Sequence, residues 1–170
     1  MFLHGLWPAL ENCALAQYIA ASSWAFPTIE TVHVIAIVTV VGSIAVMDLR
    51  LVGAASKQIA VTELSRDTLP WTWGAFVIAM ISGSLLFISK ATTYMVNPFF
   101  LWKMVLIVLA GINMAAFHFF TWRSVDKWDT TPQVPMAGKI AGGLSLLLWV
   151  LVVFVARWIG FTLDKFNPTS

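Results

Sequence analysis

A few ionisable residues stand inside long apolar stretches of this sequence, where an unpaired charge would be costly in lipid. His33 follows Glu30 by three residues, so the two share one face of a helix. Asp48 follows His33 by 15 residues, and His118 follows Lys103 by the same interval. Because 15 helical residues rise about 22 Å, the spacing predicts two polar layers. His33 and Lys103 form an outer layer, and Asp48 and His118 form an inner layer.

The outer layer has the residue types of a cofactor site. Imidazole is a common ligand of haem iron, copper and zinc. Glu30 could hold the second ring nitrogen of His33 or relay a proton. Lys103 could pair with a haem propionate, a semiquinone or another anionic ligand. Lys90 and Arg157 also lie near this layer, unless they extend to the membrane interface.

A second axial ligand is harder to find among the three histidines of the chain. His33 and His118 cannot bind one iron within one chain, because about 22 Å of helix rise separates them. The candidates are therefore His4, on the same outer side, and a histidine of another subunit, such as His118.

The inner layer and the methionines have simpler interpretations. We expect Asp48 to form an ion pair with Arg50 at a helix end, and His118 to be a hydrogen-bonded packing residue. Copper is the competing cofactor, since imidazole and thioether ligands suit it. The seven methionines, however, contain no Met-x-x-Met cluster.

The composition indicates that lipid surrounds these residues. Of the 170 residues, 59% are hydrophobic and 11% are charged, and the mean hydropathy is +0.85. A soluble domain of this size could not bury so much apolar surface. The long continuous apolar runs predict membrane-spanning α-helices rather than barrel strands. The basic residues are spread along the chain, so we do not expect a nucleic-acid partner.

The apolar runs predict one domain, residues 1–170, with four transmembrane helices. The expected spans are residues 28–47, 71–89, 99–121 and 140–160, and Asn97 should cap the third. Residues 1–27 form a lead-in, in which residues 8–21 predict a helix along the membrane surface. The single cysteine, Cys13, excludes an internal disulfide and is expected to be an apolar filler. No cleaved signal peptide is expected.

Lys and Arg residues predict the orientation of the chain. They concentrate between the first two spans and between the last two, whereas the N-terminal segment has none. The positive-inside rule makes these two loops cytoplasmic and both termini periplasmic, in a bacterial inner membrane. Small residues in the spans, at Ala79-x-x-x-Gly83 and Gly138-x-x-x-Gly142, predict close helix packing.

Part of the sequence resembles the signature of an uncharacterised bacterial family of four-span membrane proteins. That signature includes Trp24, Pro27, Glu30, His33, Gly42, Asp48-Leu-Arg50 and Gly53. More distantly, His33, Trp102-Lys103 and His118 are similar to the membrane-embedded protoporphyrinogen oxidase of bacteria and to the copper-resistance D proteins. In that oxidase family a first-span histidine and a third-span lysine are functional and haem b is bound, which implies these roles for His33 and Lys103.

The leading hypothesis is a small membrane haem b protein for electron transfer or redox chemistry near the outer leaflet. His33 would be the axial ligand, Glu30 would orient it, and Lys103 would contact a propionate or substrate. A quinone or a redox protein would be the electron partner, and we expect a homo-oligomer or a larger membrane complex. The alternatives are a copper-handling membrane protein and a non-catalytic subunit with no cofactor.

Overall fold

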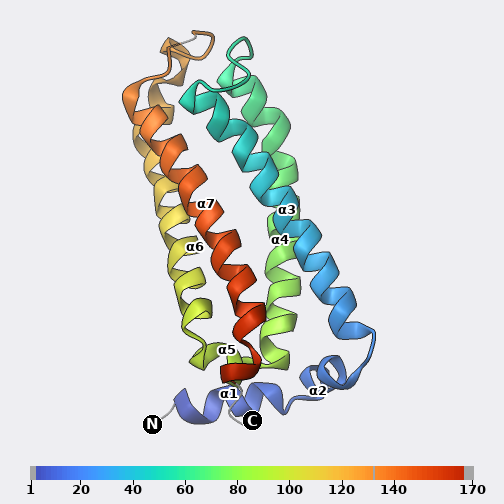
Figure 1. Ribbon diagram of the computed structural model, residues 1–170. Coiled ribbons are helices and arrows are strands. Elements are labelled where there is room, and N and C mark those ends of the chain that lie inside the picture. The colour runs from blue at the N-terminus through green and yellow to red at the C-terminus, as the bar shows by residue number, and fades with distance from the viewer. Residues whose placement is uncertain (1–2, 132, 167–170) are drawn as a thin grey trace.

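The protein is a bundle of long helices in the computed structural model, which describes residues 3–131 and 133–166 (Figure 1). The long helices are α3 (Ala25–Val52), α4 (Val61–Ser89), α6 (Pro98–Ala116) and α7 (Met136–Thr162). With the helical turns that follow α6, these make four helices long and apolar enough to cross a membrane. Over the described ranges no strand is present. The all-helical, multi-pass membrane fold is therefore confirmed.

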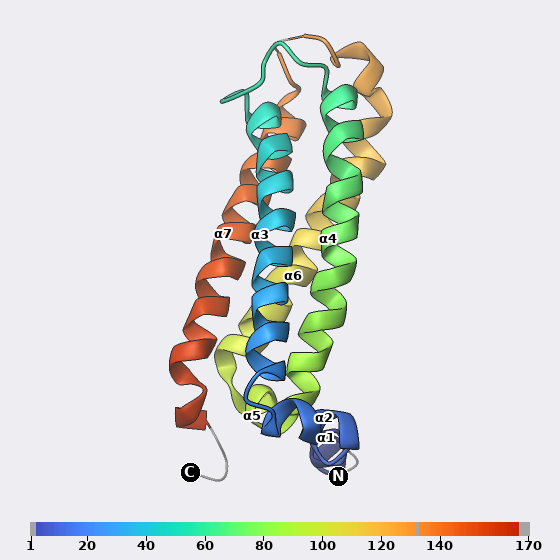
Figure 2. The same ribbon diagram turned by 90° about the vertical axis from the view of Figure 1, so that its right-hand side faces the viewer.

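The short elements gather at the two ends of the bundle. The helices α1 (Leu3–Glu11), α2 (Ala14–Ala21) and α5 (Ala91–Val96) lie at one end, near the first and last described residues (Figures 1 and 2). We name this the terminal end. The connection between α3 and α4 lies at the opposite end, together with the connection that precedes α7. This loop end therefore carries the two basic segments of the sequence.

The four long helices do not form a closed ring of contacts. Helix α3 packs against α4 and α7, and α7 packs against α6. Among the described residues, the backbones of α4 and α6 scarcely approach each other, although Phe87 of α4 stacks on Phe100 of α6 with 5.5 Å between ring centres. The bundle thus has one loosely packed face, the α4–α6 side.

Small residues allow the close packing of α3 with its two neighbours. A Cβ atom on Gly142 of α7 would lie 3.0 Å from the Leu51 Cβ and 3.1 Å from the Asp48 carbonyl oxygen of α3. In α4, Ala79 is buried, and a Cβ on Gly83 would lie 2.9 Å from the His33 ring. The packing role predicted for these small residues is confirmed.

The helices extend beyond the predicted spans, most of all at α4. This helix begins at Val61 rather than near residue 71, so Pro70 lies inside it. Its start is fixed by Asp129, whose carboxylate accepts hydrogen bonds from the Thr62 amide at 2.8 Å and the Thr62 hydroxyl at 2.6 Å. A capping side chain from another loop is not visible in the local sequence.

The predicted surface helix consists of two helices. They separate after Glu11, and Cys13 caps α2 by accepting a hydrogen bond from the Ala16 amide, with 3.4 Å between Sγ and N. Cys13 is exposed, so its expected role as an apolar filler was wrong. Glu11 fastens α1 to α5, because its two carboxylate oxygens accept hydrogen bonds from the amide and hydroxyl of Thr92, each at 2.8 Å.

The third span starts as predicted but changes character at the loop end. Asn97 caps α6 through a 3.0 Å hydrogen bond from the Phe99 amide. After α6 the chain continues as a π-helical turn, η1 (Phe117–Thr121), and a 3-10 helix, η2 (Trp122–Lys127). His118 therefore stands on a π turn, a feature often found at functional sites.

Arg50 joins the two connections at the loop end. Its side chain is fully buried, and Nε donates to the Ile59 carbonyl at 2.8 Å. Its Nη2 atom donates to the Asp129 and Thr131 carbonyls, each at 3.3 Å. The Asp48 carboxylate lies elsewhere and its Oδ2 has no partner among the described residues, so the expected ion pair with Arg50 was wrong. Two side chains two residues apart on a helix point in different directions.

Candidate functional site

His33 lies between α3 and α4 and is held by Ser82. Its Nδ1 atom is 3.0 Å from the Ser82 hydroxyl oxygen. That hydroxyl already donates its proton to the Ile78 carbonyl at 2.7 Å, so its oxygen accepts from His33 Nδ1–H. A neutral His33 then carries its proton on Nδ1, which leaves the lone pair of Nε2 available to a ligand.

Gly83 gives the His33 ring its space. A Cβ at this position would lie 2.9 Å from Cε1 of His33 and 3.7 Å from Nε2, closer than the ring could tolerate at Cε1. Ser82 and Gly83 together therefore fix the orientation of the ring. Ser82 was not identified from the sequence. Its role as the hydrogen-bond partner of His33 becomes visible only when α4 is seen to pack against α3.

Lys103 of α6 belongs to the same layer as His33. It is close enough to act electrostatically on the imidazole, and its Nζ lies 4.9 Å from the centre of the Phe100 ring. The two side chains are therefore neighbours across α3 and α6, whereas their role as one site stays a prediction. Two other cations at the terminal end also lie over aromatic rings, Lys90 over Phe26 and Arg157 over Phe161.

Glu30 does not hold the His33 ring. Its side chain is exposed, and the hydrogen bond expected from it is made by Ser82 instead. The charge of Glu30 acts on Tyr94 of α5 instead. Burial raises the pKa of Tyr94 to about 12, and the negative charge of Glu30 contributes to that rise. The side chain of His4, the candidate second ligand, lies outside the described part of the chain.

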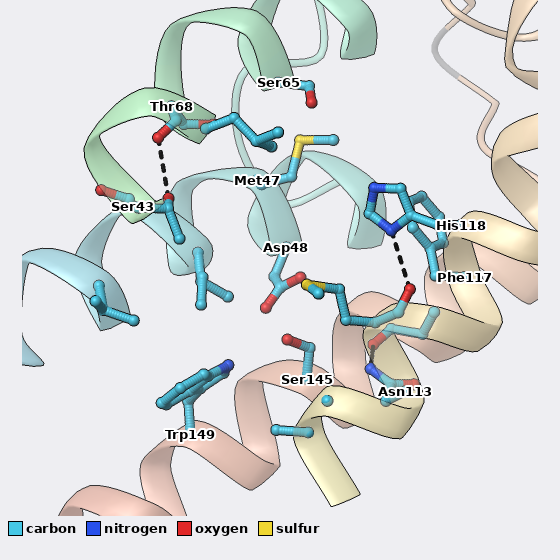
Figure 3. A pocket seen from close by; sticks show the side chains of 18 of the residues that line it. Ser43, Met47, Asp48, Ser65, Thr68, Asn113, Phe117, His118, Ser145 and Trp149 are labelled. Carbon is cyan, nitrogen blue, oxygen red and sulfur yellow. Dashed lines mark hydrogen bonds between the residues drawn. The ribbon is translucent and has the colours of Figure 1, made fainter. Parts of the chain in front are cut away.

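The inner layer is a cavity of about 210 Å³ in the loop-end half of the bundle. Asp48 of α3 and His118 of η1 both line it, as their matched spacing predicted (Figure 3). His118 donates from Nδ1 to the Met114 carbonyl at 3.0 Å, and its ring stacks on Trp122 with 5.5 Å between centres. His33 does not line this cavity, so His33 and His118 lie at separate sites.

The titratable side chains do not form a metal centre by themselves. Within residues 3–131 and 133–166, no group of three or more His, Cys, Asp or Glu side chains is placed to hold a metal ion. The described chain thus offers one imidazole in the outer layer and one in the inner layer.

Comparison with known proteins places the chain in a family. A model described as a family of unknown function, DUF6644, matches residues 15–162, which is most of the chain. This protein belongs to the DUF6644 family. In this DUF6644 member the match includes both polar layers, whereas His4 and Glu11 precede it. No curated protein and no solved structure matches the chain.

Family membership agrees with the resemblance to an uncharacterised family of four-span proteins. These comparisons do not support the more distant resemblance to the porphyrinogen oxidase and the copper-resistance D proteins. Any chemistry must therefore be argued from the two layers themselves.

Proposed function

We propose that this protein binds haem b through His33 and works in electron transfer or redox chemistry. One observation carries the proposal: Ser82 holds Nδ1 of His33 and leaves the Nε2 lone pair free. Ligating histidines usually have their other ring nitrogen fixed by such a hydrogen bond. When bound, haem supplies one-electron transfer at its iron.

The residues around His33 fit a haem better than a bare metal ion. A porphyrin brings four nitrogen ligands of its own, so one imidazole is enough to anchor it. A copper ion needs several protein ligands, and the described residues provide no cluster of His, Cys, Asp or Glu. Lys103 would place a positive charge beside a propionate, with Phe100 supporting the ammonium.

The second axial position has no histidine at the depth of His33 among the described side chains. His118 lines the inner cavity instead. The position is therefore left open, or it is filled by His4 or by a second subunit. We also propose that the terminal end faces the periplasm of a bacterial inner membrane, as the Lys and Arg distribution indicates. A quinone or a redox protein would then exchange electrons near the outer leaflet.

The test is the absorption spectrum and metal content of the protein purified in detergent. We expect a Soret band that shifts when dithionite is added. His33→Ala should lose most of the haem. Ser82→Ala should weaken haem binding roughly 10- to 100-fold, as loss of a supporting hydrogen bond does at metal sites. Ser84→Ala is the matched control, because its hydroxyl also bonds to a carbonyl one turn back but is exposed.

Other variants and outcomes test whether His33 is the haem ligand and whether the cofactor is haem. Lys103→Ala should keep haem but bind it less tightly, and His118→Ala should keep it fully. Haem loss in a folded His118→Ala protein, with haem retained in His33→Ala, would move the site to the inner layer. Stoichiometric copper without a Soret band would favour copper handling. A wild-type protein with neither cofactor would favour a non-catalytic subunit.

A further inference from the structure

The inner cavity has an unpaired acidic group in its wall, which the haem proposal does not use. Asp48 is 5% exposed, and its Oδ2 has no hydrogen-bond partner in the described residues. Figure 3 shows the carboxylate pointing into the space between α3 and α7, towards Ser145. A buried carboxylate oxygen without a donor is costly, so a ligand that brings a donor would be stabilised there.

Several polar side chains of the cavity donate their hydrogen bonds to backbone carbonyls. The Asn113 amide donates to the Ala141 carbonyl at 2.9 Å, and His118 donates to Met114. The Thr68 hydroxyl likewise donates to the Leu64 carbonyl. The wall keeps three acceptors, the Asn113 oxygen, His118 Nε2 and Asp48 Oδ2, beside the hydroxyls of Ser43, Ser65 and Ser145 and the indole N–H groups of its tryptophans. Among the described residues, Asp48 Oδ2 is the acceptor that is buried without a partner, so it gains most from a ligand that carries a donor.

The rest of the wall is apolar and aromatic. Trp73, Phe76, Trp122 and Trp149 line the cavity. Aromatic faces attract cations, most strongly when water is excluded. The volume of about 210 Å³ exceeds the roughly 150 Å³ of an engineered cavity that holds benzene, so it suits one substituted ring.

The cavity lies where the bundle is open to lipid. Residues of both α4 and α6 line it, and among the described residues the backbones of these two helices scarcely approach each other. A ligand can therefore enter from the bilayer through the α4–α6 side. Asp48 and His118 are the titratable side chains of the lining, whereas Arg50 is directed to the loop carbonyls.

We propose that this cavity binds a protonated amine carried on an apolar body of one-ring size, with Asp48 as its ion-pairing group. The ammonium supplies the donor that Asp48 Oδ2 lacks, and the aromatic wall surrounds the apolar body. This site is separate from His33 and does not depend on haem binding.

The test uses the full chain in lipid nanodiscs and two ligands of matched size. Benzylamine is protonated at neutral pH, and benzyl alcohol is its neutral counterpart. Binding is followed by tryptophan fluorescence, because Trp73, Trp122 and Trp149 line the cavity. We expect benzylamine to bind more tightly than benzyl alcohol. Asp48→Asn should weaken benzylamine at least about tenfold, as loss of a charged hydrogen bond does, and leave benzyl alcohol nearly unchanged.

A second variant tests the cavity without changing its charge. Gly111 lines the cavity and has open space where a side chain would be added, so Gly111→Leu should fold and fill the cavity. It should lose both ligands and keep any haem spectrum. Gly143→Leu is the matched control, because Gly143 also has open space but does not line the cavity.

Three results would overturn the proposal. In the first, the wild-type protein does not bind benzylamine. In the second, the alcohol binds as tightly as the amine and Asp48→Asn changes neither, which would leave a purely apolar pocket. In the third, a short-chain quinone binds in place of benzylamine and is lost in Gly111→Leu.

Discussion

The position of the His33 ring depends on a single missing side chain on the facing helix. Gly83 leaves room for the ring, and its neighbour Ser82 supplies the hydrogen bond. Gly83 acts by having no side chain, and Ser82 acts by accepting a hydrogen bond. A substitution of Gly83 should therefore displace the His33 ring while Ser82 stays in place.

We predict that Gly83→Ala destabilises the protein, although alanine is the better helix former. Its Cβ would lie 2.9 Å from the ring, and such overpacking costs about 1–3 kcal/mol. The control is Gly74→Ala on the same helix, where no atom lies within 4 Å of an added Cβ. That control should gain about 0.5–1 kcal/mol. Thermal unfolding in detergent would show the two variants shifting in opposite directions, and equal shifts would refute the steric role of Gly83.

The spacing of residues in the sequence predicted how far along the bundle each side chain lies better than it predicted the direction in which the side chain points. The rise per residue is fixed, so the layers of His33 with Lys103 and of Asp48 with His118 could be predicted. Direction around a helix is less certain, because three residues turn through about 300° and leave Glu30 about 60° away from His33. Ser82 could not be predicted, since nothing in the sequence says which face of one helix meets another.

Helix α4 shows how a distant loop can set the start of a span. Asp129 accepts hydrogen bonds from Thr62, and the Val61 amide donates to the Asp129 carbonyl at 3.3 Å. Pro70 suggested a start near itself, because a proline inside a helix removes a hydrogen bond and clashes with the preceding turn, yet α4 continues through it. The ten extra residues could not be predicted, because their cap comes from a connection more than sixty residues later.

We predict that Asp129 makes α4 sensitive to acid. Burial raises the pKa of Asp129, but hydrogen bonds from Thr62 and Val61 and the nearby Arg50 outweigh it, so the pKa is lowered overall. A lowered pKa in the folded protein stabilises it above the ordinary pKa of aspartate, and the gain is lost as pH falls through the lowered value. Asp129→Ala should cost about 1 kcal/mol near neutral pH.

Asn can still accept hydrogen bonds, so Asp129→Asn should be milder and should remove this part of the acid dependence. Unfolding measured from neutral to acid pH would test both variants. Asp126→Asn is the control, because Asp126 is exposed. An unchanged acid dependence in Asp129→Asn would mean that other groups determine it.

The arrangement of the whole chain provides a simple test of its orientation. Cys13 is exposed at the terminal end, so the native thiol reports that side. If the terminal end is periplasmic, a membrane-impermeant maleimide should label the wild-type protein in intact cells. The double variant Cys13→Ser and Ala55→Cys moves the thiol to an exposed position at the loop end and should be labelled only after permeabilisation. The reverse pattern would invert the orientation.

The hydrogen bonds that close the two ends also constrain how the protein is made. Glu11 lies 81 residues before Thr92, and Arg50 lies 79 residues before Asp129. During translation the N-terminal residues emerge first, so each of these side chains enters the membrane region long before its partner exists. Until then, Arg50 has only the Ile59 carbonyl as a partner, and the start of α4 has no cap from Asp129. Synthesis of the connection before α7, rather than of α7 itself, supplies the missing partners.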